Sequence, residues 1–124
     1  MNELVIEKTV KTPYINFDAQ SGIFKIIGRS IPENPEEFYR KLFEWLNIYF
    51  KNPQNETLIN VQLEYINSGS SKFILEFFQL IQEAKSKGFN CKINWYYEED
   101  DEDMLEVGQE MSRMSKLEFE YIIS

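Results

Sequence analysis

A cluster of hydroxyl side chains marks residues 64–72, which read EYINSGSSK. An alternating strand pattern stops at Asn67, three serines follow, and a helix-like apolar pattern begins directly afterwards. A helix N-terminus offers free backbone N–H groups and the positive end of the helix dipole, so a phosphate is tolerated there. The turn therefore has two interpretations. Either Ser68, Ser70 or Ser71 caps the helix, or one serine is a site of phosphorylation.

A run of six carboxylates, EEDDED at residues 98–103, is the second chemical feature. Oxygen ligands of this kind can bind a hard cation, but the run lacks the spacing and the glycine of an EF-hand loop. Acidic residues that open a helix are also favoured by its dipole, and nothing selects a pair for glycoside hydrolysis. We expect a solvated or partner-docking face rather than a metal site. Its residues are Glu98, Glu99, Asp100, Asp101, Glu102 and Asp103.

The composition excludes several classes of function. The 124 residues include no His, which removes Ser–His and Cys–His nucleophile pairs and the usual zinc ligands. Cys91 is the only cysteine, so no disulfide forms within the chain, and its strand pattern predicts a small core residue. No phosphate-binding glycine motif or CxxC pair is present, and we expect no cofactor.

The charge balance indicates what kind of partner to expect. Thirteen basic and 21 acidic residues give a net charge of −8, which repels nucleic acids and anionic membranes. A protein partner is favoured by elimination. The chain has no apolar run of transmembrane length, and its first residues do not resemble a signal peptide, so we expect a cytoplasmic protein.

A mixed α/β fold is expected to position these residues. Strand patterns cover residues 3–10, 13–18, 23–27, 57–66, 90–97 and 117–123. Helices are predicted from Pro35 to before Pro53, over 71–87 and over 100–112, and residues 28–34 are predicted to be a loop. The order β-β-β-α-β-α-β-α-β predicts one domain over residues 1–124, of the α/β (α+β) class. We expect one mixed sheet with helices packed mainly on one face.

Apolar periodicity predicts which side chains point inward. On the first helix these are Phe38, Leu42, Trp45, Leu46 and Tyr49. On the strand over residues 57–66 they are Ile59, Val61, Leu63 and Tyr65. On the second helix they are Ile74, Phe77, Phe78, Ile81 and Ala84, with Lys85 at the margin.

Three segments together resemble the SiaC family of small bacterial regulatory phosphoproteins. They are GRSIPENPEEFY (28–39), EYINSGSSK (64–72) and WYYEEDDEDMLEVG (95–108). TPYINFD (12–18) and the pair Trp45 and Tyr49 also fit, so the resemblance extends from about Thr12 to Tyr121. It implies the architecture of STAS-type anti-anti-sigma factors, which is a mixed sheet with helices on one side.

The resemblance also implies a function. A cognate kinase phosphorylates one hydroxyl, a PP2C-type phosphatase removes the phosphate, and the unmodified form binds an effector. In the best-known system that effector is a diguanylate cyclase, which links the family to cyclic-di-GMP and biofilm control.

The family pattern also indicates which hydroxyl is phosphorylated. The phosphorylated residue follows an Asn at the strand end, which is Ser68 here, with Ser70 in reserve. The best-known pattern has Thr at that position and a hydroxyl residue where Gly69 stands. The partner-binding residues near the switch would be Asn67, Gly69, Ser71 and Lys72.

Two other functions remain open at the level of the sequence. One is a constitutive interaction module whose acidic residues 98–103 bind a basic partner. The other is a metal-dependent enzyme that uses the same carboxylates.

Overall fold

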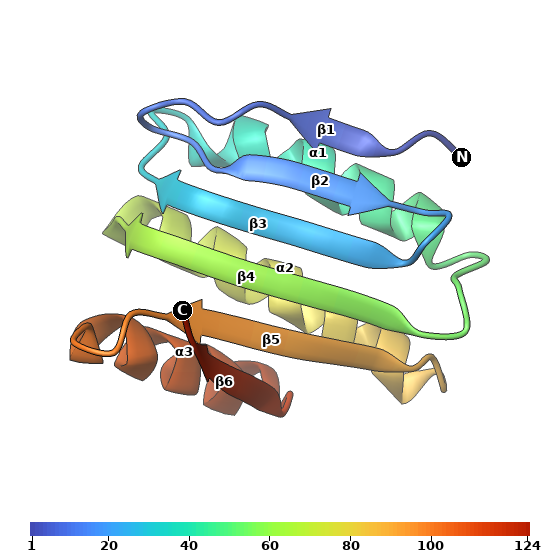
Figure 1. Ribbon diagram of the computed structural model, residues 1–124. Coiled ribbons are helices and arrows are strands. Elements are labelled where there is room, and N and C mark those ends of the chain that lie inside the picture. Colours follow the sequence, from blue (N-terminus) through green and yellow to red (C-terminus); the bar gives the residue numbers. More distant parts are fainter.

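The computed structural model, which describes residues 1–124, has the expected alternation of strands and helices (Figure 1). The strands are β1 (Leu4–Ile6), β2 (Tyr14–Asp18), β3 (Ile23–Ser30), β4 (Thr57–Ile66), β5 (Cys91–Tyr97) and β6 (Phe119–Ile123). The helices are α1 (Pro35–Tyr49), α2 (Ser68–Ser86) and α3 (Glu102–Ser115). None of these helices combines the length and the apolar character needed to span a membrane.

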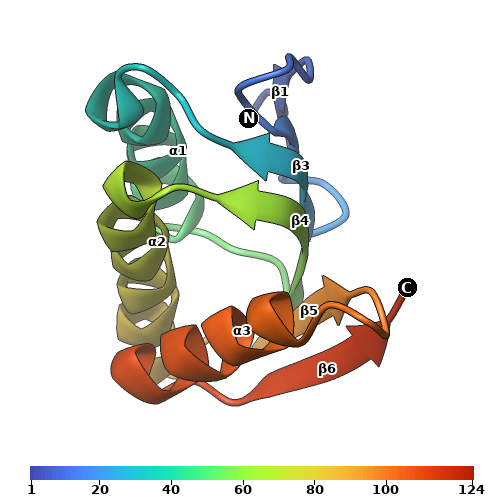
Figure 2. The same ribbon diagram turned by 90° about the vertical axis from the view of Figure 1, so that its left-hand side faces the viewer.

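One six-stranded sheet contains all the strands, in the order β1-β2-β3-β4-β5-β6. The first three strands are antiparallel neighbours, and β3, β4, β5 and β6 are parallel neighbours. Parallel neighbours need a crossover, and the three helices supply one each. Figure 2 shows the three helices on the same face of the sheet. The predicted mixed sheet with helices on one face is therefore confirmed.

The predicted loop over residues 28–34 is wrong at its start, because β3 continues through Ser30. The pairing of β3 with β4 shifts register between Gly28 and Arg29. Gly28 has a φ of 130°, which glycine adopts without the penalty that a Cβ would bring. The strand then resumes with the Ser30 side chain fully buried under the helices.

Other differences from prediction have local causes. The first strand covers only Leu4–Ile6, since a turn stabilised by the Thr9 hydroxyl follows it. Helix α2 begins at Ser68 rather than residue 71, and α3 covers Glu102–Ser115 rather than 100–112. The Tyr65 side chain is 51% exposed, although its strand parity predicts burial. The register shift between β3 and β4 leaves Glu64 as an extra, unpaired residue, so Tyr65 lies opposite the exposed Arg29 and on the outer face of the sheet.

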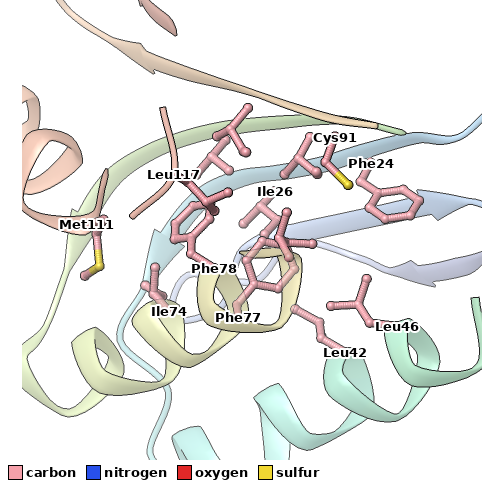
Figure 3. Packing of buried hydrophobic residues seen from close by; sticks show 14 of the residues in the cluster. Phe24, Ile26, Leu42, Leu46, Ile74, Phe77, Phe78, Cys91, Met111 and Leu117 are labelled. Atoms are coloured by element: carbon pink, nitrogen blue, oxygen red, sulfur yellow. The ribbon is translucent and has the colours of Figure 1, made fainter. Parts of the chain in front are cut away.

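The core lies between the sheet and its helical layer. Ile74, Phe77 and Phe78 of α2 point towards the strands in Figure 3, as predicted, and Cys91 is buried there as a small core residue. Ile59, Val61 and Leu63 of β4 are buried as expected, and so are Ile81 and Ala84 of α2.

Helix α1 is rotated slightly from the predicted inner face. Leu42, Leu46 and Tyr49 are buried, but Phe38 and Trp45 are only half-buried. Tyr39 is fully buried instead, and its hydroxyl lies 2.6 Å from Ser30 Oγ at the end of β3. The hydrogen bond to Ser30 gives the buried Tyr39 hydroxyl the partner that it needs on this inner face.

Candidate functional site

The turn between β4 and α2 is capped by Asn67. Its Oδ1 atom accepts the backbone N–H of Ser70 at 2.9 Å, and its own N–H donates to the Ser30 carbonyl at 3.0 Å. The prediction that one of the three serines caps the helix is therefore wrong. Asn is as good an N-cap as Ser, and here it lies at the end of the strand, before the serines.

Because Asn67 caps the helix, Ser68 is left as its first residue. The Ser68 side chain is exposed, and its hydroxyl is not used for capping. It projects at the end of α2 where backbone N–H groups have no helical acceptor and where the dipole favours negative charge. An anionic group on the Ser68 oxygen is therefore compatible with the local electrostatics.

Ser70 has the opposite environment. It is fully buried, and its Oγ accepts a hydrogen bond from Ser30 Oγ at 3.0 Å. Ser30 Oγ in turn lies 2.6 Å from the Tyr39 hydroxyl, and burial raises the pKa of Tyr39 to about 12. The three hydroxyls form a linear chain of hydrogen bonds, from Tyr39 through Ser30 to Ser70, which connects α1, β3 and α2.

The remaining residues of the turn lie around Ser68. Ser71 is half-buried and donates to the Asn67 carbonyl at 3.3 Å. Lys72 is exposed, and its ammonium group lies 5.0 Å from the centre of the Phe73 ring. A Cβ added at Gly69 would meet no atom closer than 3.8 Å, so the backbone there does not require glycine.

A groove of about 730 Å³ runs between α2 and α3, with Ser68 at one end. Its α2 wall consists of Ser68, Ser71 and Lys72, and its α3 wall of Asp103, Glu106 and Glu110. The apolar floor is formed by Leu75, Val107, Met111 and Met114. The sequence did not predict this groove, because it depends on which two helices become neighbours.

The acidic run divides between two parts of the surface. Asp101 caps α3 by accepting the Met104 N–H at 3.0 Å, and Glu102 and Asp103 occupy the first helical turn. Asp103 faces the groove, whereas Glu98 and Asp101 border a separate hollow of about 290 Å³ at the ends of β4 and β5. Glu99 and Asp100 are exposed in the loop between them. No group of His, Cys, Asp or Glu side chains is arranged to hold a metal ion.

Sequence reasoning also missed Ser30 and Tyr39 as members of the site. One signal for Ser30 was present, because the inward parity of Phe24 and Ile26 continues through residue 28 to residue 30. For Tyr39 no such signal existed, since it lies one position from the predicted inward residue Phe38.

Comparison with known proteins shows the family to which this fold and sequence belong. A family model described as SiaC family regulatory phosphoprotein matches residues 6–124. The chain belongs to the SiaC family. Its resemblance to that family, seen in three sequence segments, is thereby confirmed, and the family is one of regulatory phosphoproteins.

Solved SiaC structures have the same fold. Apo-SiaC from Pseudomonas aeruginosa is 27% identical, with a TM-score of 0.87 over 100% of this chain and 99% of that one. SiaC is also matched in a crystal structure of the diguanylate cyclase SiaD in complex with its activator SiaC. There the identity is 28% and the TM-score 0.87, over 97% of each chain.

A curated relative is also similar in sequence. It is an uncharacterized protein of Pseudomonas aeruginosa strain UCBPP-PA14, 29% identical over 110 residues, which cover 89% of this chain and 87% of that protein.

Proposed function

We propose that residues 1–124 act as one regulatory domain that works by partner switching rather than by catalysis, with Ser68 as the phosphorylated residue. The supporting observation is the contrast between two neighbouring serines. Ser68 is exposed and released from capping, whereas Ser70 is fully buried and hydrogen-bonded. A kinase needs access to the hydroxyl oxygen, which Ser70 offers only if the first turn of α2 opens. In this proposal Ser70 holds the first turn of α2 in place through its hydrogen bond to Ser30 and is not the reserve site of phosphorylation.

The regulatory cycle has three partners. A cognate kinase adds the phosphate, a PP2C-type phosphatase removes it, and the unmodified form binds an effector. Membership of a family of regulatory phosphoproteins supports the cycle. The SiaC of the complex is an activator of the diguanylate cyclase SiaD, which makes a diguanylate cyclase the leading effector class for this chain. The output would then be cyclic-di-GMP signalling and biofilm control.

Phosphate would act locally on the docking surface. It adds about −1.5 to −2 charges, and at Ser68 it would lie among Asn67, Gly69, Ser71 and Lys72. An effector that covers this turn would have to accommodate and desolvate a dianion. The partner would be released without a large rearrangement of the fold.

Phosphorylation by the cognate kinase tests the assignment. Wild type, Ser68→Ala and Ser70→Ala are incubated with the kinase and ATP, and the modified residue is located by mass spectrometry. Wild type and Ser70→Ala should gain one phosphate on Ser68, and Ser68→Ala should gain none. Equal incorporation in Ser68→Ala would remove Ser68 from this role.

Effector binding tests the switch itself. Ser68→Asp should bind the effector at least tenfold more weakly than Ser68→Ala, since only the former adds charge at the docking surface. Ser86→Asp is the matched control, because Ser86 is an exposed serine at the opposite end of α2. If Ser68→Asp binds as tightly as Ser68→Ala, and binding weakens steeply as the salt concentration rises, the constitutive interaction module with its acidic residues 98–103 is favoured instead.

A further inference from the structure

The groove between α2 and α3 has a shape suited to one kind of occupant. Figure 2 shows the two helices further apart where they begin than at the C-terminal end of α3, so the groove opens towards Ser68 and Asp103. Leu75 and Val107 are half-buried on its floor, and Met114 is 45% exposed. Methionine adapts to varied apolar partners, which makes such a floor a typical protein-binding surface.

The backbone of the occupant can be inferred from the walls. Both walls are helices, whose backbone groups are already hydrogen-bonded within α2 and α3. An extended peptide would find no strand edge on this floor with which to pair its own N–H and C=O groups. A helix satisfies its backbone internally, and the twelve residues from Asp103 to Met114 provide about 16 Å of wall, which matches about three helical turns.

The two walls carry opposite charge in the unmodified protein. Asp103 and Glu106 are exposed on the α3 wall, and Glu110 is paired with Arg113 of its own helix. The α2 wall has Lys72 and the positive end of the helix dipole, which is equivalent to about half a charge. The groove is therefore negative along α3 and positive along the N-terminal part of α2.

We propose that this groove binds an amphipathic helix of a protein partner that carries acidic residues on the flank facing α2 and basic residues on the flank facing α3. The apolar stripe between the flanks packs on Leu75, Val107 and the two methionines. The charge complementarity sets the orientation of the helix as well as its affinity. This inference deepens the proposed function, and it rests on that function only for the response to phosphate described next.

Phosphate on Ser68 would remove the charge difference between the two walls of the groove. Its charge of about −1.5 to −2 cancels or exceeds the positive charge of Lys72 and the helix end together. The α2 wall then no longer attracts the acidic flank of the bound helix. The occupant would be released because one wall changes sign, while the apolar floor stays the same.

A peptide selection tests the proposal on the full chain. A display library of helical peptides with a fixed Leu/Met stripe and randomised flanks is selected at low salt against the unmodified protein. Enriched peptides should be acidic on one flank and basic on the other, and NMR shifts should locate them at Val107 and Met111. Failure to enrich peptides with this pattern, or binding on the uncovered sheet face, would overturn the proposal.

Charge-reversed variants sharpen the test. Glu106→Lys should weaken the selected peptide about fivefold at low salt, and Lys72→Glu should do the same, because each turns an attraction into a repulsion. Glu76→Lys is the matched control, since Glu76 is an exposed carboxylate of α2 outside this groove. A peptide with exchanged flanks should regain affinity for the Glu106→Lys, Lys72→Glu double variant. Equal binding to all these variants would show that the opposite charges of the two walls do not contribute to peptide binding.

Two further variants separate this inference from the proposed switch. Ser68→Asp should weaken peptide binding relative to Ser68→Ala, because only the Asp variant adds negative charge to the α2 wall. If Glu106→Lys and Lys72→Glu weaken binding but Ser68→Asp does not, the groove is correct and the phosphate switch is wrong. If the wall variants have no effect, the groove proposal fails whether or not the kinase modifies Ser68.

Discussion

Ser30 Oγ donates a hydrogen bond of 3.0 Å to Ser70 Oγ, which joins the end of β3 to the first turn of α2. Ser30 is also bonded to the Tyr39 hydroxyl of α1. All three side chains are buried, so each hydroxyl depends on the others for a partner. The exposed Ser68 therefore lies two residues before a buried hydrogen-bond network of which its own side chain is not a member.

Ser70→Ala should destabilise the protein without removing its phosphorylation. The substitution takes away the acceptor of Ser30 and leaves a buried hydroxyl proton unpaired, at a cost of about 1–2 kcal/mol in the free energy of unfolding. Urea denaturation measures this loss. Ser86→Ala, on an exposed serine of the same helix, should change the same quantity by less than about 0.5 kcal/mol. A Ser70→Ala protein as stable as wild type would contradict the network.

Asn67→Ala should loosen the start of α2. The Ser70 N–H loses its side-chain acceptor, and the loss of an N-cap costs about 1 kcal/mol. Hydrogen exchange at the Ser70 amide should accelerate accordingly. Asn67→Asp retains a capping oxygen and should keep the wild-type stability, so equal losses in the two variants would argue against capping.

Gly69→Ala should be stabilising. The added Cβ has only ordinary contacts, the nearest being Asn67 Oδ1 at 3.8 Å, and the unfolded chain loses conformational freedom. We expect a gain of about 0.5 kcal/mol in thermal or urea unfolding. Phosphorylation of Ser68 should continue, since the added methyl group makes only these ordinary contacts. A loss of stability would show that the turn needs glycine after all.

Gly108→Ala should have the opposite effect on stability. A Cβ there would lie 2.5 Å from Trp95 Nε1, and the Trp95 indole is held by its hydrogen bond to the Met104 carbonyl. Overpacking of this kind costs about 1–3 kcal/mol. The measurement is urea unfolding followed by tryptophan fluorescence. Unchanged stability would mean that α3 can move away from β5 at little cost.

The stability of the protein should fall in alkaline solution partly because of Tyr39. Burial raises its pKa from 10.0 to about 12, so the unfolded chain releases this proton at lower pH than the folded one. The Tyr39 contribution is present below about pH 10 and is lost progressively between pH 10 and 12, by roughly 2–3 kcal/mol. Tyr39→Phe should show a smaller decrease in unfolding free energy between pH 9 and 11. An identical decrease in both proteins would exclude Tyr39 as its source.

Local signals predicted most of the fold. The start of α1 is an example: Asn34, Pro35 and Glu37 each fit their helix positions, and Asn34 Oδ1 accepts the Glu37 N–H at 3.2 Å. Strong periodicity made the existence and order of the helices and strands clear. Where Gly28 and Pro32 suggested a loop, the paired strand β4 instead held β3 extended through a bulge.

The site was less predictable because it depends on contacts between distant residues. The sequence placed Ser68 at a strand-to-helix turn but could not show that Asn67 takes the cap. Whether Ser70 faces solvent or Ser30 depends on how α2 lies against β3. The walls of the groove come from two helices, and local patterns do not specify which helices become neighbours.

The strands lie in space in the same order in which they occur in the chain. During synthesis, each new strand can therefore pair with one that is already in place, and each pairing requires the closure of only one hairpin or one crossover. No early strand has to wait, exposed, for a partner near the end of the chain. We expect folding to proceed from the N-terminal hairpin outwards, with β6 joining last at an edge that needs no insertion between strands.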